Sequence, residues 1–265
     1  MKPIVVAILL CVCAALPLAA QTAPPEGMVQ IPAGEFWMGR DHSTEMEASN
    51  KMPRGWRDDR PANLIQLDAF YLDKYEVSNA DYAKFLQANN GKAPWHWVQG
   101  KIPAGEEKVP IFNVNWFEAD AYCKWVGKRL PTEAEWEKAA RGGAESKRYP
   151  WGDRLDRNMA NFLADPMMKT SNGTTPCRSY PQNGFGLFDM AGNVWEWVSD
   201  WYDPQYYQTS PARNPIGPPP TVLRLLRGGS WLAADVRMLS CSHRHKVPPD
   251  TYSYAIGFRV ACSVP

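Results

Sequence analysis

The chain has 265 residues, 45% of them apolar, and a formal net charge of +1 at pH 7. This length allows one large domain with a substantial core, and the near-neutral charge gives no reason to expect binding to nucleic acid or to an anionic membrane surface. The unusual content of 12 Trp, 11 Tyr, 24 Pro and 19 Gly favours short elements joined by ordered loops, with aromatic side chains supplying core area.

The first 20 residues have the features of an export signal. Lys2 supplies the positive charge, residues 4–18 are apolar, and small residues up to Ala20 fit a cleavage site. The apolar stretch is short for a membrane span, although an N-terminal anchor is the alternative interpretation. We therefore predict a signal peptide at 1–20, a linker at 21–26 and one domain at 27–265. The mature protein is expected to be secreted or periplasmic, without membrane insertion.

Strand patterns open the mature chain. Residues 28–39 predict a strand, a turn at Ala33-Gly34 and a second strand. Residues 41–59 are polar and predict a surface loop, and residues 65–73 alternate weakly and predict a further strand.

Three helices are predicted next. Ser78 or Asn79 can cap the first helix. The second begins near Asn115, and helical spacing predicts its buried face, namely Trp116, Ala119, Cys123 and Val126. The third begins after Thr132, where Glu135 completes a capping box, and it ends at Gly142-Gly143.

Regular periodicity largely fails in the second half of the chain. Residues 202–220 contain six prolines and predict a long surface loop. Residues 223–230 and 256–261 predict strands. No repeat or low-complexity stretch divides the chain, so a single domain is expected.

Seven different short motifs follow one another along the mature chain. They are Gly27–Gly39, Glu76–Asn79, Lys128–Glu137, Gly184–Leu187, Gly192–Trp197, Arg227–Trp231 and Ile256–Arg259. In this order they resemble the formylglycine-generating-enzyme (FGE-sulfatase) family, over essentially the whole mature domain. The resemblance implies a compact, loop-rich α+β fold related to C-type lectins.

The positions of the family's catalytic cysteines hold other residues. Family members that make formylglycine bind copper(I) through two cysteines that follow an Arg-Gly-Gly-Ser motif. Counting forward from Ser230, these positions hold Ala233 and Met238, and counting back from Cys241 replaces Met238 by Val236. Copper(I) favours a pair of soft thiolates, and none of these residues is one. Copper is therefore not expected, and neither is formylglycine formation.

A calcium site is the most persuasive cofactor site in the sequence. The resemblance places the ligands at Asp189, the carbonyls of Gly192 and Val194, and Glu196. Independently, two carboxylates seven residues apart flank a Gly-Asn turn, and Ca²⁺ takes carboxylate and carbonyl oxygens. The alternative is that both carboxylates only cap turns.

A second calcium site of the family is less well supported. It would use Asn161 and the carbonyl of Phe162. Its other ligands would come from residues 169–173, where the expected Asp is missing.

Four cysteines remain after the signal peptide. In an exported chain they permit two disulfides with three possible connectivities. The resemblance implies Cys123–Cys262, although Cys262 lies two residues beyond the family's position. The usual partner position of Cys241 holds Ala140, so Cys177–Cys241 is the second expected pair, unless Cys241 stays free.

Two further clusters have both structural and functional interpretations. His243 and His245 alternate in an extended segment, so both side chains can face one side. With Asp250 they would form a metal site, but two partly exposed polar residues are the favoured interpretation. The aromatic cluster at 95–97 would either line a groove for carbohydrate or peptide or pack in the core.

Three functions from different classes are compatible with these observations. The favoured one is a non-catalytic, monomeric binding or scaffold module that uses residues 231–254 for a peptide, a glycan or an envelope protein. The first alternative is an exported oxidoreductase or maturation factor, with Ser230, Trp231 and His243 in its pocket. The second is a true formylglycine-generating enzyme with an unrecognised ligand set.

Overall fold

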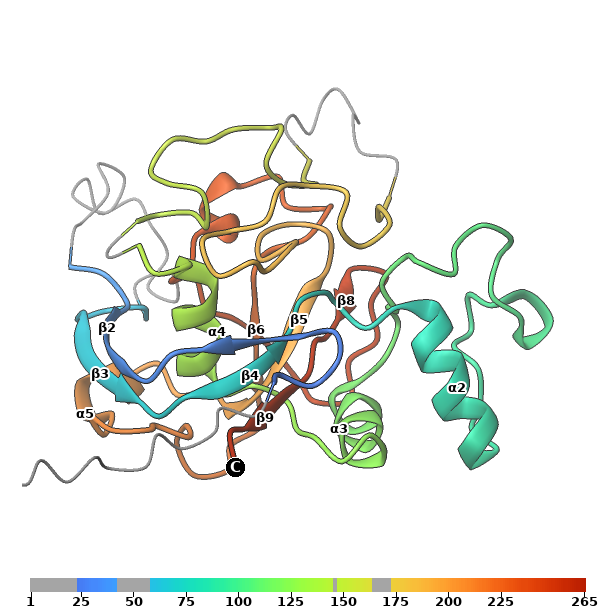
Figure 1. Ribbon diagram of the computed structural model, residues 1–265, viewed down its shortest axis with the longest axis horizontal. Helices are drawn as coiled ribbons and strands as arrows, with labels where there is room; N and C mark the ends of the chain where they lie inside the picture. Colours follow the sequence, from blue (N-terminus) through green and yellow to red (C-terminus); the bar gives the residue numbers. More distant parts are fainter. Residues whose placement is uncertain (1–22, 42–57, 145–146, 164–172) are drawn as a thin grey trace, which may run out of the picture.

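The computed structural model describes residues 23–41, 58–144, 147–163 and 173–265. Within these ranges the chain forms three small sheets and short helices joined by long loops, which confirms the predicted loop-rich α+β class (Figure 1). No helix among these residues is long and apolar enough to cross a membrane. The predicted signal peptide and most of the predicted loop at 41–59 lie outside the described residues.

Two sheets are built largely from the first strands of the chain. Antiparallel pairing joins β1 (Met28–Ile31), β4 (Phe70–Asp73) and β9 (Ala261–Ser263), so both ends of the mature domain meet in one sheet. β2 (Gly34–Met38) pairs with β3 (Asn63–Leu67). The single strand predicted at 65–73 is therefore two strands, β3 and β4, in two different sheets.

The third sheet has the order β7 (His245–Val247), β6 (Arg224–Arg227), β5 (Trp195–Trp201), β8 (Ile256–Gly257). β5 was not predicted. Most of its side chains are buried, so it lacks the alternation of apolar and polar residues that marks a half-exposed strand. The strand predicted at 256–261 is divided between β8 and β9.

The helix starts agree with the predicted caps. Ser78 accepts a hydrogen bond from the Asp81 amide at the start of α2 (Asn79–Asn89). Capping boxes at Asn115 and Thr132 open α3 (Trp116–Trp125) and α4 (Glu133–Arg141), and Gly142 ends α4 with φ +62°. These contacts join residues three positions apart, which is why the sequence predicts them.

The remaining helices are short. α5 (Tyr206–Thr209) lies within the proline-rich segment that was predicted to be a loop. Two 3-10 turns, η2 (Val98–Gly100) and η3 (Val236–Leu239), interrupt other loops.

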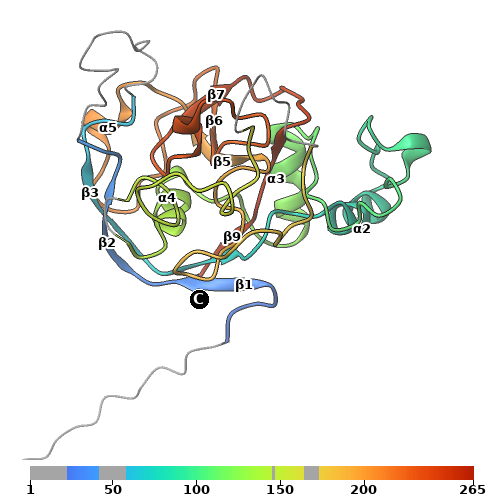
Figure 2. The same ribbon diagram turned by 90° about the horizontal axis from the view of Figure 1, so that it is seen from above.

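α4 lies at the centre of the molecule, in contact with β2, β3, β5 and β6 (Figures 1 and 2). All nine of its residues are buried, and Trp136 lies in the main apolar cluster. A second cluster surrounds Trp197 of β5 and includes the buried side of α3. Because α4 has no exposed face, its glutamates and basic residues must find partners inside the protein.

Candidate functional site

The motif that follows β6 forms a tight turn. Gly228 and Gly229 have φ +94° and +79°, values that glycine adopts without strain. A Cβ atom on Gly229 would lie 2.8 Å from Leu239 Cδ2 and 3.0 Å from the Met238 carbonyl oxygen. The turn therefore packs directly against the segment that contains Met238.

Both positions expected for the copper ligands belong to, or pack against, one apolar cluster. Ala233 is 1% exposed and belongs to an apolar cluster with Tyr149 and Leu239, and Met238 packs against the same cluster. The cluster contains no cysteine. A methyl group and a thioether therefore occupy this site, and the chain's own residues do not fit copper(I).

The three predicted pocket residues differ in their access to solvent. Ser230 and His243 are buried, and only Trp231 is partly exposed. The rings of His243 and His245 lie 5.8 and 4.7 Å from the Trp195 ring, which confirms that both face one side. Burial lowers the pKa of His243 well below its usual range. Within the described ranges, no group of three or more His, Cys, Asp or Glu side chains is arranged to hold a metal.

Trp231 belongs to a partly exposed aromatic patch, which we call the aromatic face. Its members are Trp95, Phe112, Trp231 and Tyr254. The Trp95 and Tyr254 rings lie 4.5 Å apart and are 59% and 49% exposed. The Trp231 indole donates a hydrogen bond to the Tyr254 carbonyl (3.2 Å), and the Phe112 ring lies 6.2 Å from the Tyr254 ring. His96 stacks on Phe112 at 4.1 Å, and burial lowers its pKa to about 4, so it is neutral at physiological pH.

The aromatic segment 95–97 is divided between the surface and the core. Trp95 projects onto the aromatic face, whereas Trp97 is buried and donates a hydrogen bond to Asn79 Oδ1 (3.3 Å). In an extended segment, positions 95 and 97 would share one side, because neighbouring side chains point in opposite directions. The chain departs from extended geometry here, with a turn from Pro94 to Trp97.

The carboxylates predicted to bind calcium lie in a buried cluster with a residue that the sequence did not indicate. Glu196 accepts three hydrogen bonds, two from Arg259 (both 2.7 Å) and one from the Trp136 indole (2.8 Å). Asp189 accepts one from the Arg178 amide (2.7 Å), and burial raises its pKa to about 6. We call Glu76, Asp189, Glu196 and Arg259 the carboxylate cluster.

Glu76 is the member that sequence reasoning missed. It accepts hydrogen bonds from the Asn193 side chain (2.7 Å) and the Val194 amide (3.3 Å). Its pKa is raised well above the usual range, first by burial and then by the charges of Asp189 and Glu196. Glu76 lies in the Glu76–Asn79 motif, and this was the sequence signal that could have identified it as a site residue. The carboxylate cluster thus contains three carboxyl groups but only one guanidinium group.

The backbone around the second predicted calcium site is tightly packed. A Cβ atom on Gly192 would lie 2.3 Å from the Asn161 carbonyl oxygen, and the Asn161 amide group donates to the Gly173 carbonyl (2.9 Å). Phe162 is buried in the apolar cluster around Tyr149. Most of the 169–173 segment lies outside the described residues.

The predicted disulfides are wrong for this structure, in which Cys123, Cys177, Cys241 and Cys262 are free thiols. Cys177 Sγ lies 3.6 Å from the Glu76 carbonyl oxygen, whereas Cys241 is buried beside Arg227. Cys262 Sγ contacts Met28 Sδ (3.7 Å) across the first sheet. Matching motif positions orders cysteines along the chain, but a disulfide also requires close Cβ atoms in the correct orientation.

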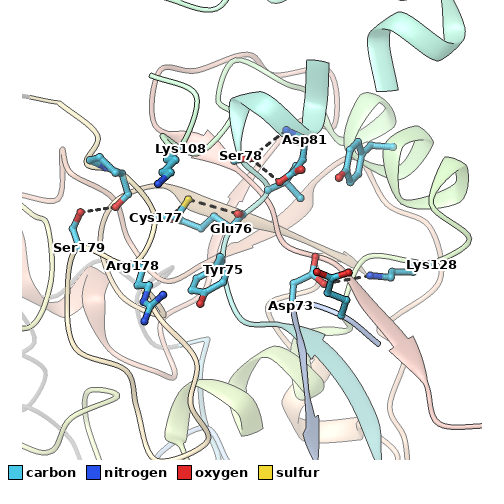
Figure 3. A pocket seen from close by; sticks show the side chains of 15 residues that line it. Asp73, Tyr75, Glu76, Ser78, Asp81, Lys108, Lys128, Cys177, Arg178 and Ser179 are labelled. Carbon is cyan, nitrogen blue, oxygen red and sulfur yellow. Dashed lines mark hydrogen bonds and ion pairs between the residues drawn. The ribbon is translucent and has the colours of Figure 1, made fainter. Parts of the chain in front are cut away.

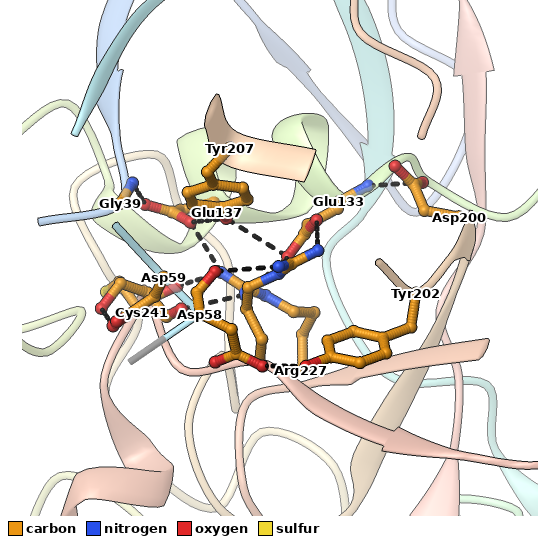
Figure 4. Close-up of polar contacts among 12 residues, drawn as sticks. Gly39, Asp58, Asp59, Glu133, Glu137, Asp200, Tyr202, Tyr207, Arg227 and Cys241 are labelled. Carbon is orange, nitrogen blue, oxygen red and sulfur yellow. Dashed lines mark hydrogen bonds and ion pairs between the residues drawn. The ribbon is translucent and has the colours of Figure 1, made fainter. Parts of the chain in front are cut away.

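A buried ion network occupies the core beside α4 and was also missed (Figure 4). Glu137 accepts from Arg227 (2.7 Å), from Arg141 (2.6 Å) and from the Gly39 amide (2.7 Å). Glu133 accepts from Arg227 (3.1 Å) and Arg244 (2.7 Å). The two glutamates stand one helical turn apart, so their side chains share a face, and that spacing was the sequence signal.

A cavity of about 690 Å³ opens elsewhere on the molecule (Figure 3). It is lined by charged side chains from several segments, including Asp73, Asp81, Lys108, Lys128 and Arg178. None of the residues of the aromatic face lines it.

Comparison with known proteins gives a consistent picture. A family model described as the sulfatase-modifying factor enzyme 1-like domain (FGE-sulfatase) matches residues 14–264. The formylglycine-generating enzyme of Streptomyces coelicolor is 35% identical over 92% of this chain and 91% of that protein. The inactive C-alpha-formylglycine-generating enzyme 2 of Mus musculus is 32% identical over 91% of this chain and 87% of that protein.

This chain is also similar in sequence to part of a larger protein and in fold to a solved structure. The serine/threonine-protein kinase Pkn1 of Chlamydia trachomatis is 38% identical over 89% of this chain, but the chain spans only 38% of that protein. The structure of PvdO from Pseudomonas aeruginosa has a TM-score of 0.72 and 26% sequence identity, and covers 89% of this chain and 94% of that one.

Proposed function

This chain belongs to the FGE-sulfatase family, and from that premise we propose that it is an exported binding module that does not generate formylglycine. The observation that supports this most directly is the packing of Ala233 and Met238. Where formylglycine generation would require two thiolates, the chain has a buried methyl group and a partly buried thioether, in or against an apolar cluster without cysteine.

We further propose that the aromatic face binds a neutral glycan. Four aromatic residues from four separate segments lie close together, and none of them is charged. The neighbouring His96 is neutral because its pKa is about 4. Large exposed aromatic groups on a soluble protein commonly mark a recognition surface, and Trp and Tyr combine an apolar ring with a hydrogen-bonding group.

Replacing Trp95 by Ala is expected to weaken glycan binding by at least about 30-fold, the effect of losing a central aromatic contact. Binding would be measured first on an array of neutral glycans and then in solution with the best ligand. Trp95→Ala should leave the fold intact, since the ring is 59% exposed. The matched control is Trp37→Ala, which removes a 40% exposed Trp from β2, outside the aromatic face.

Two results would contradict this assignment. Binding to a peptide array but to no glycan would make the ligand a peptide. Equal losses in Trp95→Ala and Trp37→Ala would show that the aromatic face is not the binding surface.

The absence of formylglycine chemistry is tested separately. Purified protein supplied with copper(I) and a Cys-x-Pro-x-Arg peptide should consume no oxygen. Oxygen uptake would support a formylglycine-generating enzyme with a different ligand set. A stoichiometric redox metal without oxygen uptake would favour the oxidoreductase or maturation factor.

We also propose that Ca²⁺ binds at Asp189, Glu196 and the carbonyls of Gly192 and Val194. The donors are hard oxygens, as Ca²⁺ requires, and three buried carboxyl groups face one guanidinium, so a cation would reduce their repulsion. Glu196 also accepts from Arg259, so the ion would share this carboxylate with the guanidinium.

Calcium is expected to raise the melting temperature of chelator-treated protein by several degrees. Asp189→Asn removes one ligand charge and should abolish most of this shift while the protein still folds. Unchanged melting with Ca²⁺, together with no calcium by metal analysis, would rule out the site.

A further inference from the structure

The charged cavity shown in Figure 3 is a distinct feature of the fold. Its volume of about 690 Å³ lies in the range of small-molecule sites. It is assembled where the end of β4, the start of α2 and the loop at 176–179 come together. Its charged side chains are divided between two walls.

One wall is acidic. Asp73 and Asp81 both line the cavity, and their charges are close enough to affect one another. Asp73 is contacted by Lys128 at 3.4 Å, a long distance for a charge-assisted hydrogen bond. Asp81 accepts from the Ser78 hydroxyl (2.7 Å) and from Lys84 (2.8 Å), which is largely exposed.

The other wall is basic. Lys108 and Arg178 line it, and neither forms an ion pair with a carboxylate among the residues the structure describes. Their segments are joined by a hydrogen bond from the Cys177 amide to the Lys108 carbonyl (2.9 Å). Figure 3 shows both basic side chains on the side of the cavity opposite Asp73 and Asp81.

Arg178 is held in an unusual conformation. Its φ is +74°, a left-handed value that is uncommon for residues other than glycine, and its amide donates to Asp189 Oδ2 (2.7 Å). Its guanidinium lies 5.6 Å from the Phe188 ring. Backbone strain of this kind is often found at ligand sites, where the surrounding structure maintains it.

We propose that this cavity binds a zwitterionic ligand, a short peptide with free ends. The carboxylate lies between Lys108 and Arg178, where it gains charge-assisted hydrogen bonds. The ammonium group lies against Asp73 and Asp81. Tyr75, Val77 and Pro176 supply apolar surface between the two walls. Opposite charges at the two ends of one cavity select for a ligand that carries both.

The proposal is tested by calorimetric titration of the full chain with trialanine, N-acetyl-trialanine and trialanine amide. Trialanine should bind, and each capped form should bind at least about tenfold more weakly, because each lacks one charge-assisted contact. The Lys108→Gln/Arg178→Gln double variant should bind trialanine as weakly as the wild type binds trialanine amide. Arg213→Gln changes an exposed arginine that does not line the cavity, so it is the control and should bind trialanine as the wild type does.

Failure of trialanine to bind would overturn the proposal, and so would equal binding of trialanine and both capped forms. Thermal melts of each variant show whether a loss of binding reflects unfolding. Trp95→Ala should bind trialanine as the wild type does, so this test and that of the aromatic face are independent.

Discussion

Replacing Arg227 by Ala is expected to destabilise the protein by about 3–5 kcal/mol, the usual cost of removing one partner from a buried ion pair. Arg227 is fully buried and donates to Glu133, Glu137 and the Ser242 carbonyl. Its loss leaves two glutamates short of a partner in the interior. Since single domains are typically stable by about 5–15 kcal/mol, much of this variant should be unfolded or insoluble at physiological temperature.

Arg213→Ala is the matched control for this prediction. Arg213 and Asp68 form a pair at 2.6 Å, but their side chains are 64% and 61% exposed. Exposed pairs contribute about 0–1 kcal/mol, so this variant should melt close to the wild type. Chemical denaturation of both variants measures the difference. Similar unfolding free energies for the two would show that the buried network does not stabilise the fold.

The second large expected effect is a pH dependence of folding stability that arises from Asp200. Asp200 is fully buried, accepts hydrogen bonds from the Glu133 amide (2.8 Å) and the Ser199 hydroxyl (3.1 Å), and caps the start of α4. Burial, followed by the charge of Glu133, raises its pKa from 3.8 to about 7. Glu135 also raises it, and the nearby Arg224 is the facing cation.

The direction of the stability change with pH follows from the proton bound by Asp200. Between pH 4 and 7 the folded protein retains a proton that the unfolded chain releases, so stability falls as the pH rises through this range. The full effect of the shift is up to about 4 kcal/mol. Asn keeps the oxygen acceptor without the charge. Asp200→Asn should therefore gain stability relative to the wild type as the pH rises from 4 to 8.

Denaturation curves of the wild type and Asp200→Asn across this pH range measure the effect. Asp250→Asn, at an exposed carboxyl, is the control and should follow the wild type. Asp73 also has a pKa raised to about 6, so the wild type is expected to lose stability through more than one group. A constant stability difference between Asp200→Asn and the wild type at every pH would contradict the assignment to Asp200.

Predictions from the sequence were most reliable where the interaction is local. Thr132 caps its helix as predicted, Ser78 is the cap of the two candidates at the first helix, and the second helix begins at Asn115 as expected. Each of these caps joins residues three positions apart. Strands were less reliable. β5 was missed because both of its faces are buried, and the boundary between β3 and β4 was missed because the two strands pair with different partners.

The candidate sites were predictable to different degrees. The residues at the copper positions are a property of the sequence alone, and the structure adds that Met238 packs against the apolar cluster that contains Ala233. Asp189 and Glu196 are seven positions apart in one motif and were predicted, whereas Glu76 joins them from a distant segment and was not. The aromatic face was predicted only in part, since Trp95 meets Tyr254 from a loop far away in the chain.

The sequence by itself determined which atoms the chain can offer: no cysteine at positions 233 and 238, hard oxygens around Gly192, and the side chains that cap the starts of α2, α3 and α4. Only the tertiary structure decided which of these atoms meet. It buried Glu133 and Glu137 against Arg227, left the four cysteines it describes as free thiols, and opened a cavity lined by acidic and basic side chains. The physical reason is that these contacts join residues distant in sequence, and their energies depend on burial, which local sequence patterns do not specify.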